Sequence, residues 1–192
     1  MSEAHEHMEH AEHAASGENK KIAMLIAVLA LFLSFSETLG KSAQTEAMDA
    51  NVKSADTWAF SQAKDIRRTT VLAAADETTL LSAGVTDPAA KSAVDKQIDT
   101  WRKTAERYES DPKTGEGLKE LRARAKELEE DRDLALAKYH NYELASAAFQ
   151  VGIVLASATL ITSIIQLAWF SGVLGIIGLV MLLLGLFAPN VL

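Results

Sequence analysis

The fold is decided by the C-terminal quarter of the chain, which reads LASAAFQVGIVLASATLITSIIQLAWFSGVLGIIGLVMLLLGLFAPNVL from Leu144 to Leu192. These 49 residues include no Asp, Glu, Lys, Arg or His, although 23% of the chain as a whole is charged. As one helix rising ~1.5 Å per residue the segment would exceed ~70 Å, more than twice the ~30 Å hydrocarbon core of a membrane. It therefore predicts two transmembrane helices, 144–169 and 172–188. The predicted reversal lies at Trp169–Gly172, where a glycine follows two aromatic residues suited to the headgroup boundary.

A second uncharged stretch runs from Ile22 to Ser36, near the start of the chain. With the three residues that follow, it reaches the ~18 residues of a minimal span, and it predicts a transmembrane helix at 20–39. A secretory signal peptide is the alternative, because two lysines precede the apolar core. No A-x-A cleavage site follows, and helical composition continues past Leu39, which favours an uncleaved anchor. Membrane lipid is therefore an expected partner.

The segment 40–143 between these anchors carries 17 of the 19 Lys and Arg residues. Acidic and basic residues alternate along it without a dominant basic patch, so we expect a water-exposed helical module and no nucleic-acid partner. Glycine and Asp-Pro signals predict a turn near 84–88. A Pro-Lys-Thr-Gly sequence predicts a kink near 111–115 in the returning arm. We interpret the module as a hairpin, and a globular three-helix cap is the competing shape.

Two periodic rows are predicted to hold the arms of this hairpin together. Both have spacings of three and four residues, the pattern of a coiled-coil seam. The row of the returning arm continues into the second span, so we expect one unbroken helix there. Its single charged member is a polar group of the kind that can select register or oligomer state. The first row comprises Met48, Val52, Ala55, Ala59, Ile66, Thr69 and Ala73, interrupted by Gln62, and the second comprises Leu118, Leu121, Ala125, Leu128, Arg132, Ala135, Tyr139, Tyr142, Ser146 and Phe149.

Each C-terminal span also carries a stripe of small and polar residues at helical spacing. Small residues let helix backbones approach closely, so we expect the two stripes to pack against each other within one subunit. The alternative is that the polar stripe of the second span faces a pore or a neighbouring subunit. The stripe of the second span comprises Gly152, Ala156, Thr159, Ser163 and Gln166, and that of the third comprises Ser171, Gly175, Gly178 and Gly185.

The N-terminal tail, 1–19, holds the only cluster with metal-ligand character, formed by His5, His7, His10 and His13. Imidazole suits zinc, nickel or copper. The tail is polar and is predicted to be disordered, so it lacks a framework that would fix metal ligands. We therefore favour a solvated, pH-sensitive tail over a functional metal site, and we expect no cofactor.

The sequence offers no residues for catalysis. It has no cysteine and none of the G-x-x-x-x-G-K-S/T, G-x-S-x-G or H-E-x-x-H motifs, so we expect no enzyme and identify no small-molecule substrate. No ionisable residue lies deep in a predicted span, because Glu37 falls at the end of the first one. This argues against a proton or ion pump.

Several short sequences resemble one bacterial family. They are NKKIA at 19–23, ETLGKSAQT at 37–45, WAF at 58–60 and QAKDIR at 62–67. They resemble the opening of an uncharacterised membrane protein family, domain of unknown function 4337, and the resemblance covers most of the chain beyond the tail. It implies a bacterial inner-membrane protein. It brings no established activity, so no functional residue is carried over.

These observations predict an all-α membrane protein with three transmembrane helices and a long, coiled-coil-like hairpin between the first and second. We expect a membrane-anchored, homo-oligomeric scaffold or assembly protein. The alternative is an oligomeric channel or transport accessory whose pore is lined by the second span, and metal sensing by the tail is a third, weaker class. Lys20 and Lys21 favour a cytoplasmic N-terminus and a periplasmic hairpin, and we expect this arrangement because the first helix usually dominates. The basic residues before the second span, Lys126, Arg132 and Lys138, favour the reverse.

Overall fold

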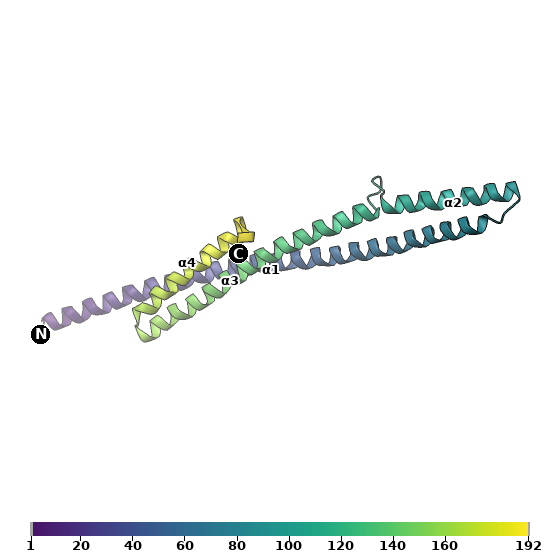
Figure 1. The fold of residues 1–192 in the computed structure, drawn as a ribbon. Helices are drawn as coiled ribbons and strands as arrows, with labels where there is room; N and C mark the ends of the chain where they lie inside the picture. Colours follow the sequence, from purple (N-terminus) through teal and green to yellow (C-terminus); the bar gives the residue numbers. More distant parts are fainter. Residues whose placement is uncertain (1, 192) are drawn as a thin grey trace. The chain divides into compact units, whose positions relative to one another are not determined.

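The computed structural model of the chain is helical throughout. It describes the backbone of residues 2–191, the burial of Gly17, and the side chains of residues 19–191. Within residues 2–191 there is no β-strand, which confirms the predicted all-α fold. The elements are α1 (Ser2–Ser82), α2 (Pro88–Glu109), α3 (Leu118–Thr162), α4 (Ile165–Phe187) and a single 3₁₀ turn, η1 (Pro189–Val191) (Figure 1).

Three of these helices are long and apolar enough to cross a membrane. Among the described residues they are α1 from Asn19 onward, α3 and α4. Most of the apolar surface of these stretches is not covered by the chain itself. Exposed apolar surface of this extent is expected where a helix contacts lipid or another chain. The predicted number of spans, three, is thus confirmed by helix length and composition.

The chain divides into two compact units, to which α1 and α3 both contribute. We call Met1–Ala47 with Asp133–Leu192 the span unit, and Met48–Arg132 the hairpin unit. The core of the span unit contains Leu29, Tyr142, Phe149 and Leu182, together with two alanines. The ring of Phe149 also stacks on that of Phe32, with centroids 5.9 Å apart, in the offset geometry that aromatic pairs favour.

The hairpin unit is formed by residues 48–82 of α1, by α2 and by the start of α3. Asp87 caps α2 by accepting a hydrogen bond from the amide of Ala90 at 2.9 Å, and Pro88 occupies the first helical position. Both α2 and the start of α3 run antiparallel to α1, because the residue numbers of paired side chains rise in one arm as they fall in the other. The pairs are Asp76–Arg102, Arg68–Glu109, Asp65–Arg122 and Trp58–Glu129.

The packing face of α1 in the hairpin unit consists of small residues. Ser54, Ser61 and Ala75 are buried and lie at multiples of seven residues, and Ala50 continues the row. The hydroxyl of Ser54 donates a hydrogen bond to the carbonyl oxygen of Ala125 at 3.2 Å. Small side chains at a seam allow two helix axes to approach closely.

The prediction of the row on α1 that forms this seam was wrong. Every member of the predicted row, from Met48 to Ala73, is exposed, and Met48, Val52 and Ile66 retain 65%, 58% and 68% of their accessible surface. The prediction followed hydrophobicity and therefore chose the larger apolar residues of α1. In the structure, α1 packs through alanine and serine instead. By contrast, the row of the returning arm is confirmed, since all its members on α3 are buried or half-buried. The predicted single helix through the second span is α3 itself.

The reversal between the last two spans also differs from the prediction. It lies at Ser163 and Ile164, whereas Trp169–Gly172 lies inside α4. Ser163 has a left-handed backbone with φ of 58°, and the hydroxyl of Thr162 accepts a hydrogen bond from the amide of Ile164 at 3.4 Å. A glycine inside a helix costs only about 1 kcal/mol, which apolar packing offsets, so Gly172 does not end the helix.

Candidate functional site

The best-defined site in the span unit is the small-residue face of α4. Its glycines lie directly against large side chains of α1 and α3. A Cβ atom added at Gly178 would lie 2.8 Å from the ring of Phe149, and one at Gly185 would lie 2.5 Å from the ring of Tyr142. A Cβ at Gly175 would lie 2.8 Å from a methyl group of Leu29. These distances are too short for real contacts, so each glycine makes room for one large side chain.

The two predicted stripes meet at Ser171 and Gly152. The Ser171 hydroxyl is fully buried and donates a hydrogen bond to the carbonyl oxygen of Gly152 at 2.7 Å. Ala156 and Thr159 are also buried, and the Thr159 hydroxyl is satisfied by a carbonyl of its own helix at 3.0 Å. The arrangement is that of packing within one subunit, the first of the two alternatives drawn from the sequence.

Two residues of the stripe predicted for the second span do not take part in this packing. Ser163 forms the reversal, and Gln166 belongs to α4, where its side chain is exposed. The three remaining members are buried inside the chain. The face of α3 that carries these three residues is therefore covered by the chain itself. It does not offer the water-exposed surface that the pore alternative requires.

Three polar contacts within the span unit were not identified from the sequence. The buried hydroxyl of Ser36 donates to the carbonyl oxygen of Tyr142 at 2.8 Å, and the amide of Gln150 donates to the carboxylate of Glu37 at 3.3 Å. The amide nitrogen of Asn141 donates to the carbonyl oxygen of Pro189 at 3.1 Å. Ser36 lies seven residues after buried Leu29, and this heptad spacing was the signal that could have revealed it.

The metal hypothesis cannot be placed on the structure. The side chains of His5, His7, His10 and His13 lie outside the described residues. Among the described side chains, no group of three or more His, Asp or Glu residues could hold a metal ion. The backbone of α1 is helical from Ser2, but helix propensity alone is marginal in water, so the predicted disorder of 1–19 stays a prediction.

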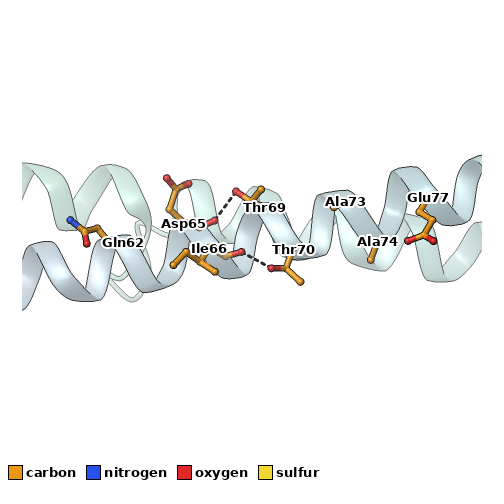
Figure 2. A pocket seen from close by; sticks show the side chains of 8 residues that line it. All are labelled: Gln62, Asp65, Ile66, Thr69, Thr70, Ala73, Ala74 and Glu77. Carbon is orange, nitrogen blue, oxygen red and sulfur yellow. Dashed lines mark hydrogen bonds between the residues drawn. The ribbon is translucent and has the colours of Figure 1, made fainter.

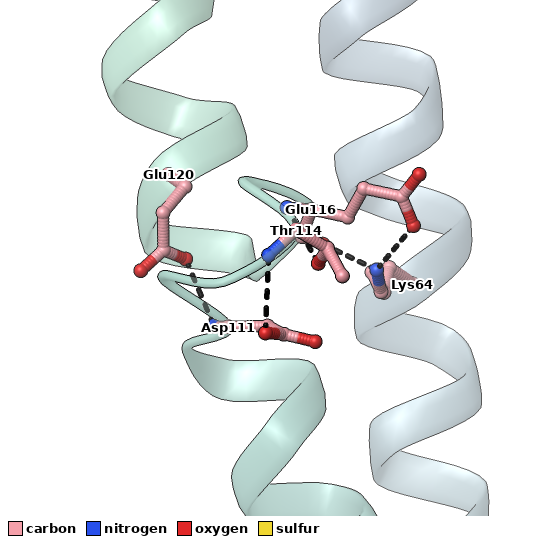
Figure 3. A network of polar contacts seen from close by, with 5 residues as sticks. All are labelled: Lys64, Asp111, Thr114, Glu116 and Glu120. Atoms are coloured by element: carbon pink, nitrogen blue, oxygen red, sulfur yellow. Dashed lines mark hydrogen bonds and ion pairs between the residues drawn. The ribbon is translucent and has the colours of Figure 1, made fainter.

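In the hairpin unit, Lys64 holds the connection between α2 and α3 (Figure 3). Its ammonium group donates a hydrogen bond to the backbone carbonyl of Glu116 and lies 3.6 Å from the carboxylate of the same residue. The rings of Phe60 and Tyr108 lie 5.4 and 5.8 Å from it, within the range of cation–π attraction. The Lys64 side chain is only 12% exposed.

The connection is also braced from within. The carboxylate of Glu120 accepts hydrogen bonds from the Ser110 hydroxyl at 2.6 Å and from the Asp111 amide at 3.3 Å. The bond from Ser110 is the main cause that lowers the pKa of Glu120. Gly115 takes a left-handed conformation with φ of 70°, where glycine is favoured. These charged groups serve to fix the backbone, and the predicted kink is a loop that ends one helix and starts the next.

The opposite side of α1 carries an open groove of about 810 Å³, lined by residues of α1 alone (Figure 2). Four of its lining residues, Gln62, Ile66, Thr69 and Ala73, belong to a longer row on α1. We call this the outer row, defined as Met48, Val52, Ala55, Ala59, Gln62, Ile66, Thr69 and Ala73. All eight residues are exposed. The row is the one that was predicted from the sequence to face the returning arm.

A family described as a domain of unknown function, DUF4337, matches residues 18–188. The chain belongs to the DUF4337 family. This match confirms the resemblance noted in the sequence and covers all four α-helices of this DUF4337 protein in large part. No curated protein and no solved structure matches the chain. The function of the DUF4337 chain therefore has to be inferred from its own surfaces.

Proposed function

We propose that this DUF4337 protein is a membrane-anchored scaffold that acts by assembling with copies of itself. The observation that carries the proposal is the outer row, which leaves the apolar side chains of Met48, Val52 and Ile66 exposed on the hairpin part of α1. Full burial of one such side chain is worth roughly 1.5–3 kcal/mol. Association with a partner that covers the row is favoured by this free energy, because these side chains stay exposed in the isolated chain.

The packing of the span unit supports a separation between anchoring and assembly. Its two small-residue stripes are used within the chain, where Gly178 receives Phe149 and Gly185 receives Tyr142. They are thus engaged in anchoring and are not needed for assembly. In this proposal the anchor lies in a bacterial inner membrane, with the N-terminus in the cytoplasm and the hairpin in the periplasm.

The proposal includes no catalysis. The charged residues that the hairpin unit places close together, such as Lys64 with Glu116, hold the backbone of a loop. A role in binding and organisation is consistent with this use of charge.

The test is a subunit count in a membrane. The full-length protein, labelled with one fluorophore per chain, is reconstituted in liposomes at low density, and photobleaching steps are counted in each particle. We expect particles with two or more bleaching steps to be more frequent than random co-occupancy would give. Single steps throughout would overturn the proposal. A single-span membrane protein, reconstituted in liposomes at the same density, sets the level of random co-occupancy.

A further inference from the structure

We propose that the outer row of α1 is the surface through which two copies associate, as a parallel, in-register coiled coil of α1 with α1. This inference rests on the proposed function, because it names the partner and the surface of the assembly. It commits to a second copy of this chain as the occupant of the groove along α1.

The periodicity of the outer row is that of a coiled coil. Its members follow spacings of four and three residues without interruption from Met48 to Ala73. This is the same 3.5-residue period as the inner packing face at Ser54 and Ser61, on another side of the helix. In a hairpin that needed no further partner, the side of a helix away from its neighbour would normally carry charges. None of the outer row is charged.

The polar members of the groove are suited to burial. The hydroxyl of Thr69 donates to the carbonyl oxygen of Asp65 at 2.9 Å, and that of Thr70 donates to the carbonyl oxygen of Ile66 at 2.8 Å (Figure 2). Because these hydroxyl protons already have partners within the helix, covering the threonines leaves no orphan donor. The amide of Gln62 can both donate and accept, so two copies of it can satisfy each other across a two-fold axis.

The direction of pairing follows from the anchor. α1 runs without a break from the first span into the hairpin unit, so two copies held in one membrane leave it in the same chain direction. Parallel, in-register pairing then places each member of the row beside its own counterpart. Val52 and Ile66 are β-branched and lie fourteen residues apart, so they occupy the same heptad position, and one polar seam residue such as Gln62 can specify register.

The flanking charges permit this register. In a parallel coiled coil, each flanking residue meets the residue five positions later on the partner. Asp65 then faces Thr70, and Leu72 faces Glu77, so neither pair brings like charges together. The seam from Met48 to Ala73 is ~39 Å long at ~1.5 Å per residue and about one helix, ~10 Å, wide. Two such stripes give on the order of 800 Å², below the ~1,200 Å² of a stable soluble interface. Anchoring in a shared membrane supplies the effective concentration that so small an interface needs.

Because the chain has no cysteine, single-cysteine variants of the full-length protein test the pairing directly. Ala59→Cys and Ala73→Cys lie on the outer row. Ala123→Cys is the matched control, an exposed alanine on α3 in the same unit. A disulfide requires two Cα atoms within about 7 Å, so in-register pairing predicts disulfide-linked dimers at both outer positions under mild oxidation in liposomes, at least ~5-fold above the control.

The outcomes separate the two proposals. Equal cross-linking at all three positions, or none on the outer row although the photobleaching count exceeds one, overturns the outer-row interface and leaves self-assembly standing. Cross-linking at position 59 without position 73 overturns the parallel register, because antiparallel helices meet themselves at only one level. A count of one overturns both proposals.

A second variant removes the apolar contact without touching the fold. Ile66→Lys places a charge at the centre of the row, and Ile66 is already 68% exposed within the chain. We expect at least a ~10-fold loss of the cross-linked dimer at Ala59→Cys, with unchanged helix content. Arg67→Lys is the neighbouring control and should retain the dimer. Undiminished cross-linking in Ile66→Lys would overturn the interface.

Discussion

The hydroxyl of Ser171 on α4 donates a 2.7 Å hydrogen bond to the carbonyl oxygen of Gly152 on α3, at a point where neither helix carries a bulky side chain. A Cβ atom at Gly152 would lie 3.4 Å from the carbonyl oxygen of Ser171 and 3.3 Å from a methyl group of Leu29. The close approach of the two backbones and the hydrogen bond therefore depend on each other. This is the packing mode that small and hydroxyl-bearing residues provide in membranes.

Replacement of Ser171 by alanine tests that hydrogen bond. Interhelical hydrogen bonds in membranes are worth roughly 0.6–2 kcal/mol, so we expect Ser171→Ala to lower the free energy of unfolding by about 1 kcal/mol. The measurement is unfolding of the full chain in mixed micelles with increasing denaturing detergent. Ser34→Ala, at an exposed position of α1, is the control and should unfold like the wild type. Equal midpoints for both variants would remove the energetic role assigned to Ser171.

Two glycines of α4 form a matched pair for the packing argument. An added methyl group at Gly178 would meet three ring atoms of Phe149 at 2.8–3.0 Å, whereas one at Gly172 would meet nothing within 4 Å. Gly178→Ala should lower stability by about 1–3 kcal/mol, the usual cost of overpacking. Gly172→Ala should be neutral or stabilising by up to ~1 kcal/mol, because alanine is the better helix former. Thermal unfolding in the same micelles compares them, and a cost at Gly172 equal to that at Gly178 would contradict the contact with Phe149.

The difference between these glycines also shows what the sequence could and could not predict. Spacing alone identified the stripe with Gly178, because close packing requires small residues at a helical period. Spacing could not locate the reversal, because Gly172 is a conspicuous helix breaker that faces open space, whereas Ser163 takes its left-handed conformation in a run without proline or glycine. Local backbone geometry of this kind depends on the hydroxyl contacts around it.

The two arms of the hairpin give a similar lesson. The seam on α3 was predictable because Leu118 and Leu121 are large, and burying them dominates any other pairing. The seam on α1 was not, because Ser54 and Ser61 contribute little hydrophobic free energy and are chosen for their size. The larger Ile66 was assigned to the seam instead. A hydrophobic pattern locates apolar rows, but it does not say whether this chain or a second copy covers them.

Lys64 provides a test of the loop between α2 and α3. Its ammonium group donates a hydrogen bond to the backbone of Glu116 and lies close to the rings of Phe60 and Tyr108, so Lys64→Met should release the loop while keeping the aliphatic part of the side chain. We expect at least ~5-fold faster proteolytic cleavage within residues 110–117. Lys53→Met is the control, since Lys53 forms an ion pair with Asp49 one turn away and is largely exposed. Equal cleavage of both variants and the wild type would show that Lys64 does not restrain the loop.

Glu120 makes the same loop sensitive to acid. The Ser110 hydroxyl donates to its carboxylate and is the main cause that lowers the pKa of Glu120 from the ordinary value of 4.5. A carboxyl group with a lower pKa in the folded state binds protons more weakly there than in the open state. Its contribution to loop stability is therefore complete above pH 4.5 and is lost as the pH falls through the folded pKa.

Ser110→Ala should remove most of this pH dependence. At pH 7 the amides of the loop should exchange with solvent faster in the variant than in the wild type, because the carboxylate has lost its principal partner. As the pH is lowered through the folded pKa of Glu120, the wild type loses the same contribution, so the two proteins should converge once the intrinsic pH dependence of exchange is corrected. Hydrogen exchange followed by mass spectrometry over residues 110–120 measures the difference, and Ser92→Ala, at an exposed position of α2, is the control. A gap between Ser110→Ala and the wild type that stays constant as the pH falls from 7 until the Glu120 carboxylate is protonated would contradict the assignment of this carboxylate as the group that titrates.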